Sequence, residues 1–323
     1  MRLKPVGLIL WAAGALAPGM SFAADYPARP IRYVIGTGLG SISDLAARSF
    51  AEKLSLRLRQ PVVVETKPGG AGLVGMNAAL SAEPDGYTIF SSSSSVMSLP
   101  ALMKAFTYDL NKDVIQITIS VRGRVATVVN ASSPIRSMAD LVAYMKANPG
   151  KVNFGSSGVG HADHLAGELF NTLAGVKMQH VAYKGGAPAM TELVGGNIEL
   201  IFSTVSTAVT FIKAGRIRAL AVTSAKRVDL FPDLPTVAEA GVPGFAVDNW
   251  YCFIGPRGMP RPVVIKLHRE LNRVFELPDV KQRLEGFGIF PFLLPTPEAF
   301  GDYIKSESKK YARVVKDAGI RAD

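Results

Sequence analysis

The sequence contains a single cysteine, Cys252, among 323 residues. One thiol excludes a disulfide framework and any zinc or iron–sulfur site built from several cysteines. Charged residues are also few, at 19%, whereas apolar residues reach 48%, so the chain can bury a large core and general disorder is excluded. After the first two dozen residues, no apolar run approaches the ~20 residues that a membrane-spanning helix needs. The length is roughly twice that of a common single domain, so we expect two lobes.

The formal net charge is +10, and the basic residues are spread along the chain rather than gathered in a tail. This distribution favours anionic small molecules as partners and gives no reason to expect nucleic acid.

Residues 1–23 have the layout of a secretory signal peptide. Arg2 and Lys4 form a positive start, an apolar run follows, and small residues lie at positions −3 and −1 of a cut after Ala23. A membrane anchor is the alternative, but the apolar run is short and ends at Pro18-Gly19. We therefore expect an exported chain whose net charge falls by two, to +8, when these residues are removed. In an oxidising compartment Cys252 has no internal partner, and we interpret it as a small buried hydrophobe.

Short β-like runs alternate with helical stretches along the remaining chain. We expect strands at residues 31–35, 62–64, 87–90, 125–129, 152–154, 179–181, 199–202 and 218–222. We expect helices from about residue 43, and at 137–147, 164–173, 187–195, 261–275 and 297–316. On the first helix, apolar residues recur at three- and four-residue steps, from Ala47 to Leu58. This alternation predicts an α/β fold with parallel or mixed sheets covered by helices.

Two strand-like runs are candidates for connections between the lobes. They are residues 125–129 and 245–254, the latter followed by Gly255-Pro256. If both cross between lobes, lobe 1 contains residues 24–124 plus 251–323, and lobe 2 contains residues 125–250.

The feature that recurs is a strand that ends in Gly, Ser or Thr and then starts a helix. It occurs at residues 36–43, 91–98, 155–161, 184–188 and 203–207. In an open parallel sheet such loops gather at the carboxyl ends of the strands, where ligands bind. Helix starts present N–H groups and about half a positive charge each, so several of them together predict a carboxylate site. Alternatively, Gly and Ser simply suit turns and helix caps.

Other chemistry is less well supported by the motifs. Gly36, Gly38 and Gly40 have the spacing G-x-G-x-G rather than the G-x-G-x-x-G of dinucleotide-binding loops. His161 and His164 could share a helix face as metal ligands, with only Asp163 or Glu168 as a third ligand nearby. The serine-hydrolase motif G-x-S-x-G is absent. We therefore expect no cofactor, no metal and no catalytic residues.

The chain resembles a known family along nearly its whole length after the leader. Matching segments lie, in order, at residues 26–31, 60–65, 67–69, 84–88, 147–151, 155–158, 164–168, 183–185, 187–189, 213–223 and 235–241. Examples are Tyr26-Pro27-x-Arg29-Pro30-Ile31 at the start and Pro84-Asp85-Gly86-Tyr87-Thr88. In these segments the sequence resembles the periplasmic solute-binding proteins of tripartite tricarboxylate transporters, also called Bug-type receptors.

The resemblance implies a type II periplasmic-binding-protein fold, with two lobes joined by two crossing strands, and a small carboxylate held between the lobes. It implies a tripartite transporter as the membrane partner and a monomeric receptor. Carried over by position, the first-lobe ligand-binding residues are Thr37, Gly38, Leu39, Gly40, Ser41, Asp44, Ser93, Ser94 and Ser95. Those of the second lobe are Ser157, Gly158, Gly160, His161, Tyr183, Lys184, Ser203 and Thr204.

The sequence departs from the family pattern close to these loops. The first loop lacks the usual Pro-Phe pair and contains Leu39 and Ile42, although Asp44 matches. Asn130 stands where the family often has Pro, and Arg122 and Arg124 lie in a segment that is usually less basic.

We therefore expect a non-enzymatic periplasmic receptor that closes around a small organic carboxylate for delivery to a transporter. A receptor that docks on a sensor kinase is the alternative. An exported enzyme would need a titratable pair in the cleft, for which Asp44, His161 and Lys184 are the candidates.

Overall fold

The computed structural model describes residues 26–37, 39, 42–97, 99–103, 106–123, 125–228, 230–286, 289–317 and 319–320. The predicted leader, Gly38, Gly40, Ser41 and Arg124 lie outside the described residues. In the described part of the chain, no helix is long and apolar enough to cross a membrane.

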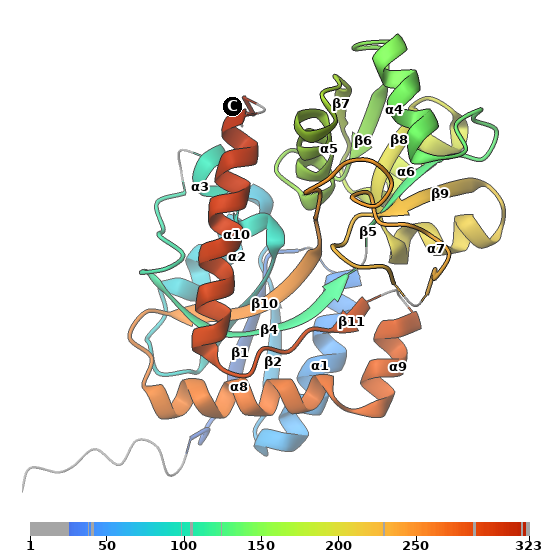
Figure 1. Cartoon of the computed structure of the whole chain (residues 1–323). Helices are drawn as coiled ribbons and strands as arrows, with labels where there is room; N and C mark the ends of the chain where they lie inside the picture. The colour runs from blue at the N-terminus through green and yellow to red at the C-terminus, as the bar shows by residue number, and fades with distance from the viewer. Residues whose placement is uncertain are drawn as a thin grey trace, which may run out of the picture.

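Two separate sheets organise the molecule (Figure 1). The first has six strands in the order β11-β4-β10-β3-β1-β2 and the second has five in the order β7-β6-β8-β5-β9. We call the six-stranded sheet and its helices lobe 1, and the five-stranded sheet and its helices lobe 2. The first sheet contains β1 (Ile31–Ile35), β2 (Val62–Thr66), β3 (Thr88–Ser93), β4 (Val114–Gly123), β10 (Asn249–Pro256) and β11 (Ile289–Pro291). The second contains β5 (Val125–Asn130), β6 (Asn153–Ser156), β7 (Gln179–Ala182), β8 (Leu200–Thr204) and β9 (Ile217–Val222).

Both sheets are mixed, which agrees with the predicted fold class. In lobe 1, β1 pairs in parallel with β2 and β3, whereas β10 runs antiparallel to β3 and β4. In lobe 2, β6 is parallel to β7 and β8, and β5 is antiparallel to β8 and β9. The antiparallel strands are those next to the crossings between the lobes, where the chain leaves one sheet and enters the other.

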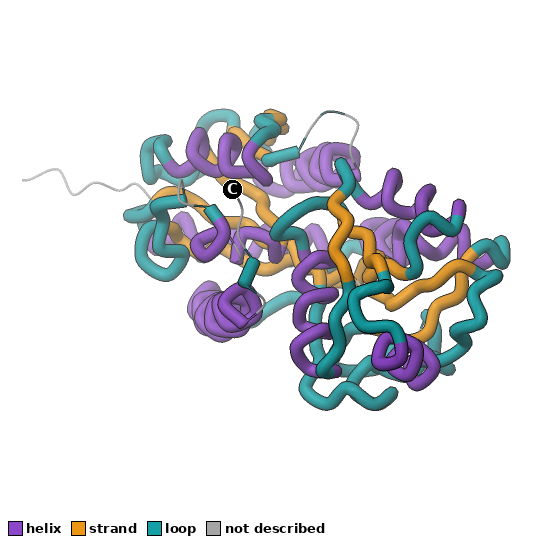
Figure 2. Tube along the Cα trace, turned by 90° about the horizontal axis from the view of Figure 1, so that it is seen from above, coloured by secondary structure: helices purple, strands orange, loops and turns teal. Residues whose placement is uncertain are grey.

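Helices cover both faces of each sheet, and seen from above the strands lie between them (Figure 2). In lobe 1, α1 (Ile42–Leu58), α8 (Arg261–Phe275) and α9 (Pro278–Gly286) pack on one face. On the other face lie α2 (Leu73–Leu80), α3 (Leu99–Leu102) and α10 (Pro297–Asp317). In lobe 2, α4 (Met138–Ala147) and α5 (Ala162–Ala174) oppose α6 (Gly186–Gly195) and α7 (Val205–Lys213). Short 3₁₀ helices η1 (Gly70–Gly72) and η2 (Ser94–Met97) complete lobe 1.

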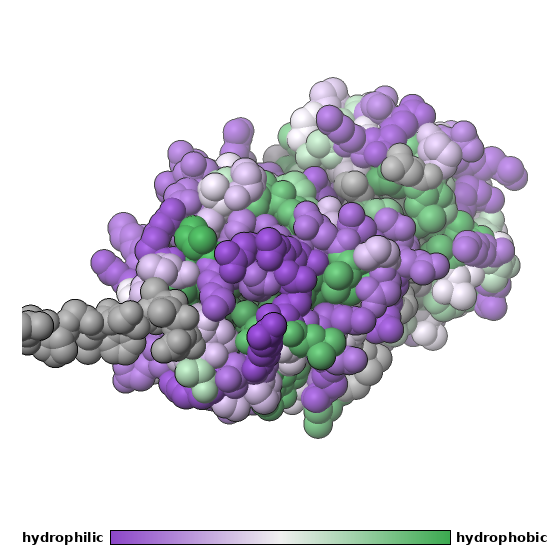
Figure 3. All heavy atoms as spheres, turned by 90° about the horizontal axis from the view of Figure 1, so that it is seen from below, coloured by the Kyte–Doolittle hydropathy of each residue, from purple (hydrophilic) through white to green (hydrophobic). Residues whose placement is uncertain are grey.

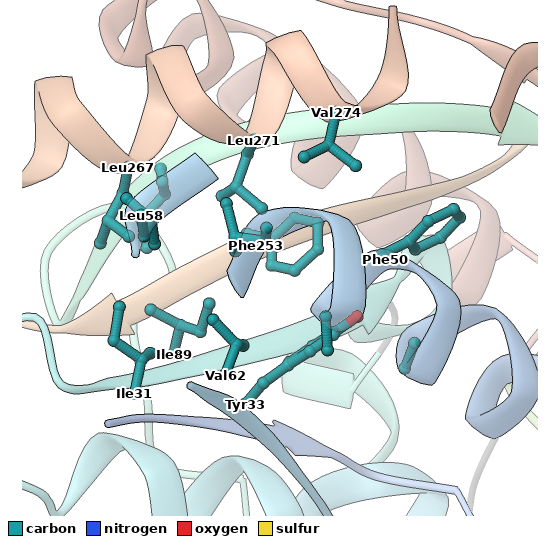
Figure 4. Close-up of a cluster of buried hydrophobic side chains, with 14 of the residues drawn as sticks. Ile31, Tyr33, Phe50, Leu58, Val62, Ile89, Phe253, Leu267, Leu271 and Val274 are labelled. Atoms are coloured by element: carbon teal, nitrogen blue, oxygen red, sulfur yellow. The ribbon is translucent and has the colours of Figure 1, made fainter. Parts of the chain in front are cut away.

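The apolar face predicted on the first helix is the face that α1 buries. Ala47, Phe50, Ala51, Leu54 and Leu58 all join the core between α1, α8 and the sheet. Figure 4 shows Phe50 and Leu58 among the buried side chains of this cluster, together with Ile31 and Leu267. The surface seen from below is mostly hydrophilic, with apolar residues in several separate places (Figure 3).

The chain crosses between the sheets at two adjacent points. Only residue 124 separates β4 from β5, and the return passes Val247, whose N–H donates to Thr223 O at 2.9 Å, before β10 begins at Asn249. An ion pair of 3.3 Å joins Arg122 and Asp248, one from each crossing. The crossings therefore lie between strands, whereas the sequence suggested that residues 125–129 and 245–254 themselves cross. The predicted residue limits of the two lobes stay a prediction.

Cys252 is buried in β10, as interpreted from the sequence. Burial raises the pKa of its thiol to about 12, so the thiol is protonated and unreactive as a nucleophile.

Candidate functional site

A cavity of about 420 Å³ lies between the two lobes and is lined by both. Its walls include the end of β1, the end of β3 and α1 from lobe 1, and the starts of α5, α6 and α7 from lobe 2. The crossings also reach it, because Gly123, Val125 and Asn249 belong to the lining. This volume lies within the range of ligand pockets, roughly 300–1,000 Å³.

The lobe 2 wall is built from three helix N-termini. His161 is the N-cap of α5, α6 begins at Gly186, and Thr204 is the N-cap of α7. All three residues line the cavity. The first N–H groups of an α-helix have no acceptor within the helix, and each N-terminus carries about half a positive charge. This wall therefore favours a negatively charged group.

Hydroxyl groups lie beside these helix starts. Ser203 and Thr207 line the cavity, and Thr207 Oγ1 lies 2.9 Å from Thr204 Oγ1. Hydroxyls rotate and can donate as well as accept, so they can adapt to the position of a ligand oxygen.

The loop after β6 is held by hydrogen bonds of its own. The Ser157 N–H and Oγ donate to Asp163 Oδ2 at 2.6 and 2.5 Å, and the Gly158 N–H donates to Ser156 Oγ at 3.1 Å. Gly158 and Gly160 both have positive φ, 139° and 80°, which explains why this loop requires glycine. We expected the main-chain N–H groups of this loop to point at the ligand. Instead, the N–H groups of Ser157 and Gly158 donate to the side chains of Asp163 in α5 and of Ser156.

Asp163 lies at the centre of this arrangement and lines the cavity. Loss of hydration raises the pKa of its carboxyl, although the hydrogen bonds from Ser157 and the charge of His161 act in the opposite direction. The side chain fixes the loop, since it accepts from Ser157 and from the His164 N–H.

Two histidines stack behind the same loop. The rings of His164 and His180 are 3.8 Å apart, centroid to centroid, and His164 Nδ1 accepts the Gly160 N–H at 3.0 Å. Burial lowers the pKa of His164 to about 3 and that of His180 to about 4, so both rings are neutral at neutral pH. Since Nδ1 accepts, the proton of the neutral His164 ring is on Nε2, which faces Glu168 at 3.8 Å. His164 is thus a structural support, whereas His161 lies at the cavity.

The lobe 1 wall begins where two loops approach closely. A Cβ added to Gly36 would lie 2.6 Å from the Gly72 Cα, so only glycine fits there. Thr37 follows at the cavity, and the serines at the end of the neighbouring strand β3 belong to the same wall, with Ser93 Oγ 2.7 Å from Ser95 Oγ.

Behind these polar groups the lobe 1 wall is aromatic. Tyr33, Phe50, Phe253 and Phe275 line the cavity, and each belongs also to the core beneath α1 and α8. These residues could not be assigned to the site from the sequence, because nothing in their local pattern distinguishes a cavity wall from ordinary core.

The structure gathers seven of the predicted ligand-binding residues at the cavity: Thr37, Ser93, Ser95, Ser157, His161, Ser203 and Thr204. It places others beside the lining. Ser94 Oγ donates to the Asn249 Oδ1 at 3.2 Å, Asp44 is buried on α1 and pairs with Arg48 at 3.0 Å, and Gly158 and Gly160 lie in the loop after β6. Leu39 and Lys184 are exposed. Tyr183 is half-buried, and burial raises the pKa of its hydroxyl. Gly38, Gly40 and Ser41 lie outside the described residues. Which of these residues contact a ligand stays a prediction.

Two lining residues that were not assigned to the site from the sequence, Asp163 and Thr207, both lie in the first turn of their helices. Asp163 is the second residue of α5 and Thr207 is the third of α7, each just after a Gly- or Ser-containing loop. The sequence signal that could have identified both residues is an oxygen-bearing side chain in the first turn of a helix that follows such a loop.

No group of three or more His, Cys, Asp or Glu side chains in the described residues is arranged to hold a metal ion. His161 and His164 do not converge, since the Nδ1 of His164 is used by Gly160 and its ring stacks on His180.

Comparison with known proteins agrees with this architecture. A family model described as the tripartite tricarboxylate transporter family receptor matches residues 46–320. Protein BugT of Bordetella pertussis is 32% identical over 322 residues, which is 99% of this chain and 98% of BugT. The structure of the periplasmic binding protein BugD is 33% identical with a TM-score of 0.78, covering 92% of this chain and 100% of BugD. An R. palustris protein solved with adipate is 30% identical with a TM-score of 0.81, covering 92% and 99% of the two chains.

These matches confirm the resemblance drawn from the sequence and the two-lobed fold that it implied. The chain belongs to the tripartite tricarboxylate transporter receptor family and is a binding protein rather than an enzyme.

Proposed function

We propose that this chain is a periplasmic receptor that captures a small organic carboxylate between its lobes and delivers it to a tripartite tricarboxylate-type transporter. The observation that carries the proposal is the convergence of the α5, α6 and α7 N-termini on one cavity between the lobes. The relative solved with adipate supports a carboxylate as the ligand.

The helix ends and hydroxyl groups around the cavity fit an anion rather than a cation, although the lining also contains Asp163. Among the described lining residues none is Lys or Arg, so the attraction comes from helix ends and hydroxyl groups. The positive charge of the whole chain adds a long-range attraction that raises the capture rate at low salt.

Binding by lobe closure follows from the two crossings. Both are short, and Arg122 and Asp248 tie them to each other. Rotation about residues 123–125 and 247–249 would bring the helix starts of lobe 2 toward Thr37 and the serines of lobe 1. Closure would exclude water and strengthen the hydrogen bonds to the ligand.

Delivery to a permease is proposed over docking on a sensor kinase because the matching family is named for a transporter. Cross-linking of the receptor in intact cells, followed by identification of the membrane protein attached to it, separates the two. Export with cleavage after Ala23 is part of the proposal, and mass spectrometry of the periplasmic protein would then give Ala24 as the first residue. Sedimentation analysis checks the expected monomer.

The test of carboxylate binding uses protein that has been unfolded, freed of bound ligand and refolded. Calorimetry and thermal shift would compare acids with neutral and cationic molecules of the same shape, such as benzoate, benzamide and benzylamine. Binding confined to the acids is expected. A shift with sugars or cations and none with any acid would overturn the proposal.

A further inference from the structure

The joint between the lobes carries a polar side chain on the cavity side. We propose that Asn249 binds the ligand by donating an amide N–H to a carboxylate oxygen, and that Ser94 is the residue that positions this amide. The inference rests on the proposed function and deepens it, because it adds a binding residue at the joint rather than at a helix start. The family resemblance predicts Ser94, and not Asn249, as a ligand contact.

Asn249 begins β10 on the face of the strand that lines the cavity. Asn249, Tyr251 and Phe253 all belong to the cavity lining. Trp250 and Cys252, which alternate with them, lie in the core on the opposite face of the lobe 1 sheet. Because successive side chains of a strand point to opposite faces, this alternation places the Asn249 side chain on the cavity side.

The residue paired with Asn249 on β4 is Gly123, which also lines the cavity. A Cβ added to Gly123 would lie 3.3 Å from the Asn249 carbonyl oxygen and 3.9 Å from the Asn249 Cβ. A larger residue at this position would therefore lie against the Asn249 side chain. Since glycine has no side chain, the paired position on β4 leaves the amide uncovered.

Two hydrogen bonds determine which edge of the amide faces the cavity. Asn249 Oδ1 accepts from Ser94 Oγ at 3.2 Å, and Ser94 is buried outside the described cavity lining. Asn249 Nδ2 donates to the hydroxyl of Tyr251, a lining residue, at 3.4 Å. The oxygen is thus turned toward the protein interior and the NH₂ group toward the cavity. A carboxamide has two N–H donors, and the described residues provide an acceptor for one of them.

This orientation gives the ligand a donor that carries no charge. Ser94 holds the amide oxygen away from the cavity, so the edge that a ligand meets can donate to an oxygen. Hydrogen bonds to an ionised carboxylate are stronger than those between neutral groups. The described cavity lining contains no Lys or Arg, so a neutral donor of this kind contributes more to anion binding here than it would beside a fixed positive charge.

The experiment measures binding by calorimetry on ligand-stripped protein with adipate, benzoate, malate and citrate, and follows each acid that binds the unchanged chain. Asn249→Asp keeps the size of the side chain, removes the donor and adds a repelling carboxylate, so we expect roughly 10-fold weaker binding or more. Asn77→Asp adds the same charge to lobe 1 at an exposed position of α2, outside the described lining, and should bind within about 2-fold of the unchanged chain.

A double-mutant cycle tests Ser94 as the positioning residue. Ser94→Ala should weaken binding about 3-fold or more, because the amide loses the hydrogen bond that orients it. The same change in a chain that already carries Asn249→Ala should alter the affinity less than about 1.5-fold. A serine that only stabilised the fold would weaken binding equally in both chains. Urea denaturation of each variant shows that the affinities refer to folded protein.

The outcomes separate this inference from the proposed function. If the unchanged chain binds none of the acids, the proposed function fails. If acids bind but Asn249→Asp loses less than about 10-fold, or Asn77→Asp loses as much, Asn249 is not a ligand-binding residue and the receptor function stands. Equal effects of Ser94→Ala with and without the Asn249 amide would overturn the positioning role. Should Asn249→Asp not fold, Asn249→Ala takes its place and is expected to weaken binding about 5-fold or more.

Discussion

The two walls of the cavity are built by the same kind of fold but from different residues. On the lobe 2 side, β6 ends at Ser156 and β8 at Thr204, and three helices begin at the cavity, so the wall presents hydroxyls and helix N-termini. On the lobe 1 side, a thin layer of Thr37 and serines covers an aromatic cluster shared with the core. The lobe 2 wall therefore suits a negatively charged group, whereas the lobe 1 wall limits the shape of the ligand.

This difference has a consequence for stability as well as for binding. The residues of the lobe 2 wall are held by polar contacts such as those between Ser157 and Asp163, whereas those of lobe 1 are held by close packing. Changes in packing should harm lobe 1 most, and changes in charge or pH should harm lobe 2 most.

The largest effect is expected from Gly36→Ala in lobe 1. The added Cβ would meet the Gly72 backbone at 2.6 Å, and neither loop can move away without disturbing the cavity. We expect a loss of about 1–3 kcal/mol in unfolding free energy, as for other overpacked sites, measured by urea denaturation, and at least 10-fold weaker ligand binding. Gly186→Ala in lobe 2 is the matched control, because its nearest contact would be Ser157 Oγ at 3.4 Å. Equal stability of the two variants would contradict this account.

Asp163→Ala tests the polar support of lobe 2. Without the carboxylate, the Ser157 N–H and Oγ and the His164 N–H lose their acceptor. Loss of an acceptor for buried donors typically costs about 1–3 kcal/mol, and the loop after β6 should loosen and bind its ligand more weakly. Asp140→Ala removes a comparable carboxylate at the start of α4, outside the cavity lining, where it accepts the Arg136 N–H at 3.0 Å. A loss of affinity in the Asp140 variant as large as in the Asp163 variant would argue against a local effect.

Acid should destabilise the protein through the histidine stack of lobe 2. The folded pKa of His164 is lowered to about 3, below the ordinary 6.5, so between these values the unfolded chain binds a proton that the folded chain does not. Stability is therefore complete above pH 6.5 and falls as the pH drops toward 3, by at most about 1.4 kcal/mol per pH unit for this histidine. His180 acts in the same direction between 6.5 and about 4.

The measurement is the unfolding temperature as a function of pH. His164→Asn places an amide oxygen near the position of Nδ1 and so keeps an acceptor for the Gly160 N–H, but it does not titrate, so its profile should be flatter between pH 6.5 and 4. His161→Gln removes a nearby imidazole at the cavity and serves as the control. An unchanged slope in the His164 variant would show that the acid sensitivity lies elsewhere, for example at His268 in lobe 1, whose pKa burial also lowers.

The smallest effect is expected from Thr207→Val, which removes one hydroxyl from the lobe 2 wall and leaves its shape. One lost hydrogen bond, about 0.5–1.5 kcal/mol, corresponds to roughly 2- to 13-fold weaker carboxylate binding, with little change in stability. Thr210→Val, on an exposed position of the same helix, should bind as the unchanged chain does. Equal affinity of the two variants would show that Thr207 does not bind the ligand.

The sequence was most informative where one apolar face repeats. Helix α8 was predicted at its observed bounds, because Val263, Leu267, Leu271 and Val274 recur at helical spacing and are buried together. The Gly- and Ser-rich helix starts likewise pointed to the polar wall, since unpartnered N–H groups there are a property of local sequence.

Strand β4 was not predicted, although it lies between β10 and β11 in the lobe 1 sheet. Its polar residues find partners only in the fold: Thr118 Oγ1 donates to Asn272 Oδ1, and Ser120 Oγ donates to Tyr251 O. The aromatic wall was missed for a related reason. Its rings come from positions as distant as Tyr33 and Phe275, and only the folded sheet brings them together.

The position of Trp250 makes its fluorescence a reporter of the joint between the lobes. It is fully buried in β10, two residues from Asp248 at the crossing, and its ring lies against Phe300 and Tyr303. The chain's other tryptophan, Trp11, lies in the predicted leader. The emission of the processed chain would then come from one indole beside the moving joint, so its intensity or wavelength should report lobe rotation without an added dye.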